Sequence, residues 1–132
     1  MKEITLFEKL LPVTPVVPLS GDYGDNHFYI KRDDMLPFSF GGNKVRKAAE
    51  FYREIKNSDT DVVMTYGSNS SNHCRIIANM AASMGLACHV ISPEENRERL
   101  YNTAFVEQLG AVIETCPVTK VAETIENRKA AY

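Results

Sequence analysis

The sequence predicts an α/β fold in which a parallel β-sheet lies between two layers of helices. Short apolar segments at residues 61–66, 86–91 and 111–115 alternate with segments whose apolar residues recur at helical spacing. This alternation is typical of parallel strands joined by right-handed helical crossovers. The strand segments are short and largely apolar, as expected for a sheet that is covered on both faces.

The chain before this alternation is expected to form an arm. Residues 1–24 contain Pro12, Pro15 and Pro18, which favour an irregular or extended backbone, and a single α/β domain is expected over residues 25–132. The PxxP spacing also fits a ligand of an SH3-like groove. The more common role of such prolines is to hold an N-terminal arm against its own domain.

The remaining elements follow from composition and periodicity. Residues 27–32 are rich in β-forming residues and predict a strand, and residues 33–42 predict a loop. Helices are predicted at residues 44–56, 72–84, 95–109 and 118–131. Asn43 is expected to cap the first of these helices. Gly85 and Gly110 are expected to end the second and the third.

Composition limits the classes of function. The 132 residues are enough for about one domain, the net charge is −2, and the basic residues are not massed in one block. Neither nucleic acid nor an anionic membrane surface is therefore indicated as a partner. The odd number of cysteines, without CxxC spacing, suggests reduced thiols in a cytoplasmic protein, and no metal site is predicted. No signal peptide or membrane-spanning stretch is recognisable.

The most informative segment is FGGNKVRK at residues 40–47. It sets Lys44 and Lys47 on one face of a helix start, where both ammonium groups can reach one small anionic ligand. The glycine pair before them allows the backbone to approach that ligand closely. One lysine then suits covalent chemistry and the other a phosphate. The alternative is that both are ordinary solvated lysines.

Neighbouring cations are expected to affect the charge of Lys44, the lysine proposed for covalent chemistry. Lys31, Arg32, Arg46 and Lys47 lie close to Lys44 in the sequence and are expected to disfavour its charged form. An uncharged amine is the form that Schiff-base chemistry needs.

A second candidate site is the segment GSNSSNH at residues 67–73, which follows a predicted strand and opens a predicted helix. Ligands in open α/β sheets bind at such loops, outside the carboxyl ends of the strands. Hydroxyl, amide and backbone N–H groups there suit a carboxylate or a phenolic oxygen. Helix capping alone is the alternative, although one residue of this kind suffices for a cap.

These segments together resemble one enzyme family. KRDD at residues 31–34, FGGNKVRK at residues 40–47 and GSNSSNHCR at residues 67–75 are similar to motifs of the tryptophan-synthase-β-like (fold type II) pyridoxal-phosphate enzymes. The GGNKxRK form resembles the branch of 1-aminocyclopropane-1-carboxylate deaminase and D-cysteine desulfhydrase. The resemblance extends over about residues 11–115. Ser70 departs from it, because the branch usually has glutamine at that position.

The resemblance implies pyridoxal 5′-phosphate as cofactor and assigns roles to the matching residues. Lys44 matches the lysine that forms the Schiff base and moves the substrate's α-proton. Asn72 matches the asparagine beside the ring oxygen, and Lys47 a basic residue near the phosphate. Asn43 is included among the cofactor-binding residues. Substrate-binding residues are then Ser71, Asn72 and His73, with Ser71 also counted as catalytic beside Lys44.

Length qualifies the functional expectation, because members of this family are about two domains long. The chain is therefore expected to be the N-terminal portion of a pyridoxal-phosphate-dependent lyase or deaminase, with the C-terminal catalytic domain absent. Its substrate is expected to be a small amino acid, and a C-terminal partner chain or a homo-oligomer is expected. The alternative is a non-catalytic α/β module that docks a partner. Nucleotide-binding motifs such as GxGxxG are absent from the sequence.

Overall fold

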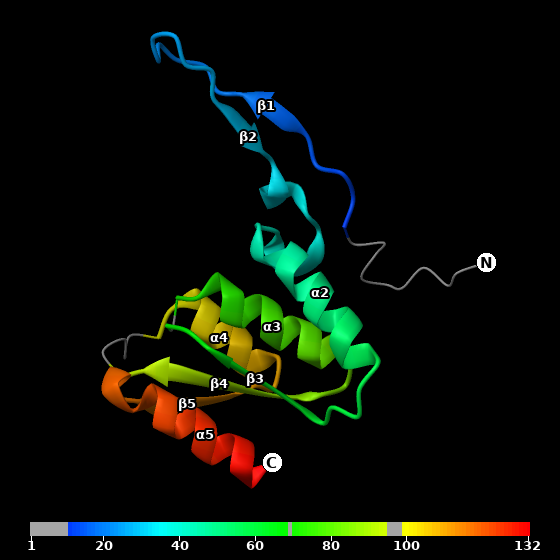
Figure 1. Cartoon of the computed structure of the whole chain (residues 1–132), viewed down its shortest axis with the longest axis vertical. Coiled ribbons are helices and arrows are strands. Elements are labelled where there is room, and N and C mark those ends of the chain that lie inside the picture. Colours follow the sequence, from blue (N-terminus) through cyan, green and yellow to red (C-terminus); the bar gives the residue numbers. More distant parts are fainter. Residues whose placement is uncertain (1–10, 69, 95–98) are drawn as a thin grey trace, which may run out of the picture.

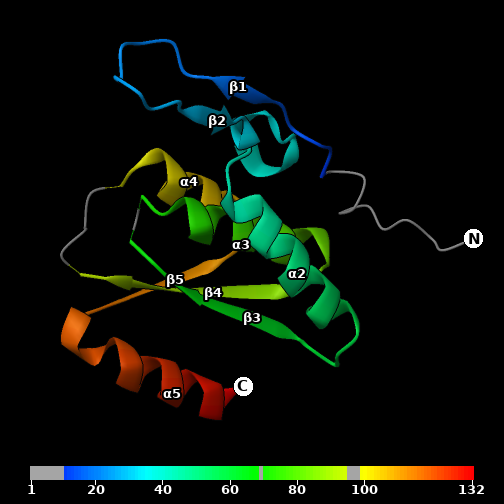
Figure 2. The same cartoon turned by 45° about the horizontal axis from the view of Figure 1, so that its top comes forward.

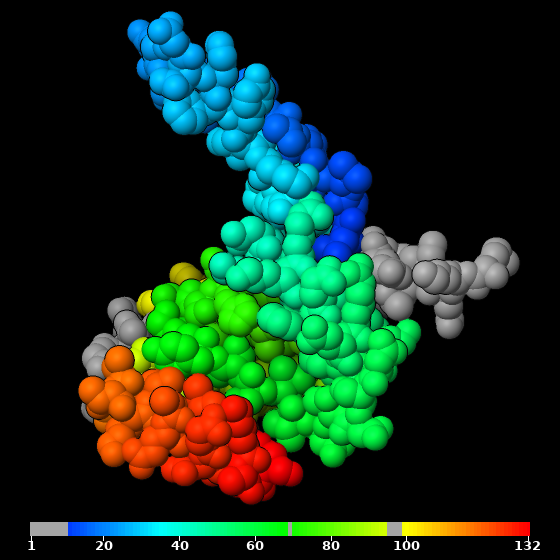
Figure 3. All heavy atoms as spheres, in the orientation of Figure 1, coloured from blue at the N-terminus to red at the C-terminus, as the bar shows by residue number. Residues whose placement is uncertain are grey.

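The computed structural model describes residues 11–68, 70–94 and 99–132. It consists of an α/β body and a two-stranded hairpin that leads away from it (Figure 1). In the space-filling view the hairpin is a narrow column that projects from the rounder body (Figure 3). Residues 1–10 of the predicted arm lie outside the described residues.

The hairpin corrects the prediction for the strand at residues 27–32. β2 (Tyr29–Lys31) is shorter than the predicted strand at residues 27–32, and it pairs antiparallel with β1 (Val16–Pro18) rather than with the parallel sheet. The prolines of residues 12–18 predict an irregular or extended backbone and no defined strand. The β-branched pair at Val16 and Val17 forms one nevertheless, because a three-residue strand needs few backbone N–H groups.

The main sheet has three parallel strands in the order β3-β4-β5. They are β3 (Val62–Tyr66), β4 (Ala87–Pro93) and β5 (Val112–Cys116), close to the three predicted segments. The central strand β4 is buried from its second residue onward, whereas every residue of β3 is half-buried or exposed.

Helices cover both faces of this sheet. α2 (Lys44–Lys56), α3 (Asn72–Ser83) and α4 (Tyr101–Gln108) lie on one side, and α5 (Val121–Ala131) lies on the other (Figures 1 and 2). The predicted three-layer α/β architecture is confirmed. A 3-10 turn, η3 (Val118–Lys120), precedes α5 within the segment predicted as one helix. No helix among the described residues is long and apolar enough to cross a membrane.

The helix predicted over residues 95–109 was extended too far toward the N-terminus. Residues 95–98 lie outside the described part, and α4 begins only at Tyr101, after a Leu100 that provides no side-chain cap. An ion pair joins Arg99 Nη2 to Glu107 Oε2 at 2.7 Å. This contact joins a residue just before α4 to the last turn of the helix.

Two apolar clusters hold the layers together. The first joins α2 to α3 and contains the predicted inner face of α2, where Val45, Ala48 and Ala49 are buried against Ile76 and Met80. The second joins α3 and α4 to the sheet. Gly85, with a φ of +72°, follows α3 as predicted.

A polar cluster attaches α5 to the opposite face of the sheet. The buried His89 of β4 has its Nδ1 2.8 Å from the Tyr132 hydroxyl and its Nε2 2.9 Å from the Glu114 carboxylate. Arg128 of α5 donates two hydrogen bonds to the same carboxylate, at 2.7 and 3.0 Å. These hydrogen bonds lower the pKa of Glu114.

Candidate functional site

The loop before α2 has a backbone that few residue types tolerate. It contains two 3-10 turns, η1 (Asp33–Met35) and η2 (Phe38–Phe40), and leads into the glycine pair. Ser39 and Phe40 have φ values of +50° and +61°, which are uncommon outside glycine. Gly41, with φ +72° and ψ −165°, occupies a region that is essentially restricted to glycine.

Lys44 and Lys47 lie on the first turn of α2. Lys44 is half-buried and Lys47 is exposed. Neither ammonium group forms a hydrogen bond or an ion pair with another residue in the described part of the chain. Asn43 occupies the capping position, but its side chain accepts no hydrogen bond from the helix, so its predicted capping role is wrong. The reason is conformational, because Asn43 has helical φ and ψ instead of the extended backbone of a cap.

The cations just upstream are arranged differently, around the Asp33 carboxylate. Arg46 binds it with both Nε and Nη2, each at 2.8 Å, and the Thr14 hydroxyl donates to it at 2.6 Å. Lys31 donates to the Thr14 hydroxyl at 2.9 Å and lies 3.9 Å from Asp33. The hydrogen bonds from Arg46 and Thr14 hold the pKa of Asp33 well below its ordinary value.

Arg32 is also paired, with Asp34 at 2.7 Å. Of the four cations expected to crowd Lys44, three are thus balanced by carboxylates within or beside the loop. Lys47 is the one left without a carboxylate among the described residues.

The second candidate loop runs from the carboxyl end of β3 into α3. Ser71 caps this helix, because its Oγ accepts a hydrogen bond from the Cys74 N–H at 3.2 Å. Ser68 and Ser70 hydroxyls lie 3.2 Å apart, and residue 69 lies outside the described part. Asn72 and His73 are the first two residues of α3. Among the described residues of this loop, helix capping therefore uses one polar side chain, that of Ser71.

His73 connects the two loops. Its half-buried ring packs edge-on against Phe51 of α2, with 6.5 Å between centroids. Burial, followed by the positive charges of Lys44 and Lys47, lowers the pKa of His73. The fold thus places the lysine pair at the start of α2 and His73 at the start of α3 in one electrostatic neighbourhood.

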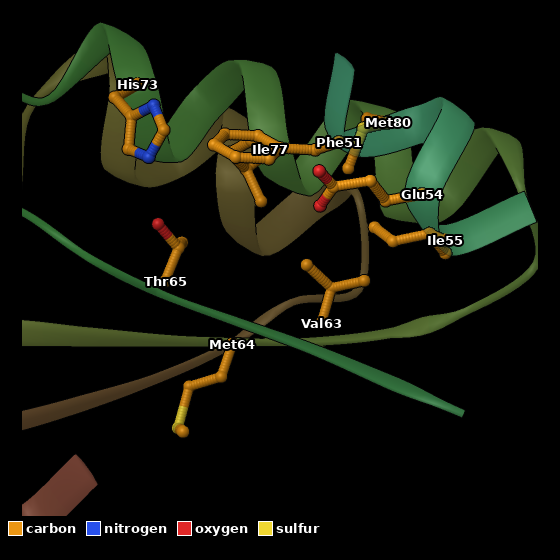
Figure 4. Close-up of a pocket in the computed structure, with 9 residues that line it drawn as sticks. All are labelled: Phe51, Glu54, Ile55, Val63, Met64, Thr65, His73, Ile77 and Met80. Atoms are coloured by element: carbon orange, nitrogen blue, oxygen red, sulfur yellow. The ribbon is translucent and has the colours of Figure 1, made fainter. Parts of the chain in front are cut away.

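His73 also borders a pocket of about 220 Å³ between α2, α3 and β3 (Figure 4). The lining is mostly apolar and comprises Phe51, Glu54, Ile55, Val63, Met64, Thr65, His73, Ile77 and Met80. In the close-up, Val63 and Thr65 point from β3 toward the helices, whereas Met64 points to the other face. Lys44 does not line this pocket, so the pocket lies beside the lysine site and not within it.

Two residues outside the predicted site, Arg75 and Asn102, hold the loops in place. The guanidinium of Arg75 donates to the Ser39 carbonyl and, at 3.3 Å, to Asn72 Oδ1. Asn102 of α4 donates to the same Oδ1 at 3.1 Å. Arg75 could have been singled out, because it is a charged residue among helix positions that are otherwise apolar and buried in α3. Asn102 had no comparable signal.

The chain is similar to known proteins both in sequence and in structure. The sequence model of the family described as "Pyridoxal-phosphate dependent enzyme" matches residues 4–132. A D-cysteine desulfhydrase of Serratia proteamaculans is 35% identical over 111 residues, which cover 78% of this chain and 34% of the relative. The enzyme of the same name from Salmonella paratyphi A is 31% identical over 129 residues, which cover 89% of this chain and 39% of the relative. The chain therefore spans little more than a third of these relatives.

Solved structures support the fold. The structure of an ACC deaminase homologue matches 92% of this chain and 38% of the homologue's chain, with a TM-score of 0.73 and 24% identity. The structure of an O-acetylserine dependent cystathionine β-synthase from Helicobacter pylori matches 99% of this chain and 44% of the synthase chain, with a TM-score of 0.67 and 20% identity.

Proposed function

Since this chain belongs to the family of pyridoxal-phosphate dependent enzymes, we propose that it supplies the lysine-bearing part of an active site. The enzyme is a lyase or deaminase that acts on a small amino acid, of the D-cysteine desulfhydrase or 1-aminocyclopropane-1-carboxylate deaminase type. The printed activity of the relatives supports D-cysteine as the first substrate to test.

The observation that carries the proposal is the open lysine pair. Lys44 is half-buried at the start of α2, has no partner among the described residues, and lies one turn from an equally unpaired Lys47. An aldehyde cofactor with a phosphate needs a primary amine and a second cation, so the donor set fits pyridoxal phosphate. When bound, this cofactor supplies the electron sink for carbanion chemistry.

The surrounding residues have distinct tasks in this proposal. Lys44 holds the cofactor and moves the substrate proton, Lys47 faces the phosphate, and Asn43 borders the cofactor at the helix start. Asn72 donates its amide N–H to the ring oxygen and contributes to the substrate site.

Ser71 and His73 bind the substrate carboxylate. The Ser71 oxygen already accepts the N–H of Cys74, which leaves its hydroxyl hydrogen to donate. The lowered pKa keeps His73 neutral near pH 7, so it offers one ring N–H.

The partner requirement is a separate part of the proposal. The chain spans about a third of the relatives' length, and we propose that activity needs the remaining part, on the same chain or on a partner chain. A homo-oligomer is compatible with this requirement. The three cysteines are unpaired and buried, which supports a reducing compartment such as the cytoplasm.

The test is covalent trapping on Lys44. The chain is incubated with pyridoxal phosphate, reduced with borohydride and mapped by mass spectrometry, with and without the C-terminal part of a D-cysteine desulfhydrase. We expect the adduct on Lys44, and more of it when the C-terminal part is present. Lys44→Ala should lose the adduct, and Lys56→Ala, at the far end of the same helix, should keep it.

Two outcomes contradict the proposal. One is the absence of an adduct in both preparations. The other is an adduct that persists unchanged in Lys44→Ala. Either result favours the alternative of a non-catalytic α/β module that docks a partner, which predicts no adduct on Lys44.

A further inference from the structure

Arg75 is a buried charge without a carboxylate. It is 6% exposed, and none of the ion pairs between described residues includes it. Burial lowers the pKa of its guanidinium. Its contacts are instead two oxygen acceptors and the ring of Phe40, whose centroid lies 5.3 Å from the guanidinium carbon. A buried charge held by neutral groups is costly, so its placement calls for a role.

One of its hydrogen bonds fixes the lysine loop. Arg75 Nη1 donates to the carbonyl of Ser39, a residue with a left-handed backbone directly before Phe40 and the glycine pair. The Phe40 ring covers the guanidinium and packs on Phe105 of α4 at 5.2 Å between centroids. The strained backbone that leads to Lys44 is therefore held from α3 and α4.

The other hydrogen bond fixes the orientation of an amide. Asn72 Oδ1 accepts from Arg75 Nη2 at 3.3 Å and from Asn102 Nδ2 at 3.1 Å, while Asn102 also donates to the Ser70 carbonyl at 2.7 Å. A flipped Asn72 amide would set its NH₂ group against two donors. In the hydrogen bonds that join described residues, Asn72 Nδ2 is not used, so it remains a donor for a ligand acceptor.

We propose that Arg75, with Asn102, is a positioning residue that sets the Lys44 loop and the Asn72 amide relative to each other and aims the Asn72 N–H at the ring oxygen of the cofactor. This inference rests on the proposed function. Arg75 acts through Ser39 and Asn72 and does not itself touch the cofactor.

The test compares Arg75→Met, Asn72→Ala and the double variant in the chain supplemented with the C-terminal part. Each is titrated with pyridoxal phosphate, and the pH dependence of the bound cofactor's visible absorbance is recorded. We expect about tenfold weaker binding in each single variant, the loss expected for one hydrogen bond, and the same displacement of the pH profile. The double variant should lose less affinity than the sum of the two single losses, because part of the Arg75 effect passes through Asn72 and the rest through Ser39.

Controls separate positioning from folding. Arg53→Met removes an exposed arginine of α2 and should bind as the wild type does. Asn102→Ala removes the second donor from a less buried position and should displace the pH profile in the same direction. In the cofactor-free chain, NMR of the Asn72 side-chain amide should show loss of its single orientation in Arg75→Met and retention in Arg53→Met.

The outcomes distinguish failure of the positioning role from failure of the proposed function. If the wild type forms no adduct on Lys44, the proposed function fails. If the wild type binds and Arg75→Met keeps its affinity and pH profile, the positioning role fails. Additive losses in the double variant also overturn it, as does an Asn72 amide signal that does not change in Arg75→Met.

Discussion

Two groups of cations flank the glycine pair, and the fold treats them in opposite ways. The paired group, Lys31, Arg32 and Arg46, is bound to Asp33 and Asp34. The open pair, Lys44 and Lys47, has no carboxylate among the described residues. Both groups lie within seventeen consecutive positions, 31–47, of one chain. The density of positive charge therefore does not mark the candidate site, whereas the lack of a balancing charge does.

The paired group serves the architecture. Through Asp33 it joins Thr14, at the base of the hairpin, to Arg46 on α2, which are 32 positions apart in the sequence. Bidentate arginine–carboxylate contacts of this kind restrict geometry as well as contributing energy. The open pair lies on the same helix and contributes no such link, which leaves both amines available to a ligand.

The largest loss of stability is expected from a substitution at Gly41, which lies between Asp34 of the loop and the start of α2. A Cβ on Gly41 would lie 2.5 Å from the Asp34 carbonyl oxygen, so Gly41→Ala should separate the loop of the paired group from the start of α2. We expect a loss of about 3 kcal/mol in the free energy of unfolding, from strain and a backbone clash together. Urea unfolding followed by circular dichroism measures it.

Gly85→Ala is the matched control for this change. Gly85 has the same φ of +72°, but nothing lies within 4 Å of its added Cβ. We expect only the conformational cost, about 1 kcal/mol. Equal losses in the two variants would show that the contact with Asp34 is unimportant.

Removing the centre of the paired group should have the next largest effect. Asp33→Ala leaves Arg46 and Thr14 without their shared acceptor, and we expect the chain to lose about 2 kcal/mol of stability. Asp34→Ala breaks only the exposed contact with Arg32 and should change stability little. Thermal unfolding of both variants checks the difference, and a similar melting temperature for the two would contradict the central role of Asp33.

The pH dependence of stability sharpens the same contrast. The pKa of Asp33 is lower in the folded chain than in the unfolded chain, because Arg46 and Thr14 bind the ionised form. Its contribution is therefore present above about pH 4, the ordinary value for an aspartate, and is lost as the pH falls below it. Asp33→Asn should be less stable than the wild type near neutral pH, and the gap should narrow below about pH 4. A gap that stays constant would exclude the carboxylate charge as its source.

The smallest expected effect reports on the open pair. Lys44 and Lys47 both lower the pKa of His73, although burial lowers it more. Lys44→Met and Lys47→Met should each raise the pKa of His73, as followed by NMR of its ring protons. Lys56→Met should leave it unchanged. No rise in either variant would mean that the two loops are not close in solution.

Much of this fold could be predicted because its helices and central strands bury apolar residues at regular spacing. The bounds of α2 follow directly from Val45, Ala48 and Ala49, and Gly85 follows α3 as expected. The hairpin could not be placed, because a three-residue strand shows no periodicity and its partner lies between prolines. The start of α4 was missed because Leu100 carries no capping signal.

The sequence motifs predicted which residues form the candidate site, but not the hydrogen bonds that hold those residues in place. Motif spacing drew attention to Lys44 and Asn72, but hydrogen bonds over long sequence separations decide how they are held. Arg75 reaches Ser39 over 36 positions, and Asn102 reaches Asn72 over 30. Such contacts depend on how α3 and α4 pack, which local sequence does not encode.

The placement of α5 determines where the sheet can grow. Because α3 and α4 lie on one face, right-handed crossovers advance the chain from β3 to β4 to β5. α5 lies on the other face, so a right-handed connection through it runs in the reverse direction. A fourth parallel strand in a longer protein would therefore add beside β3, not beside β5. The strand β3, now a half-exposed edge strand, would then lie inside a wider sheet, next to the pocket that His73 borders.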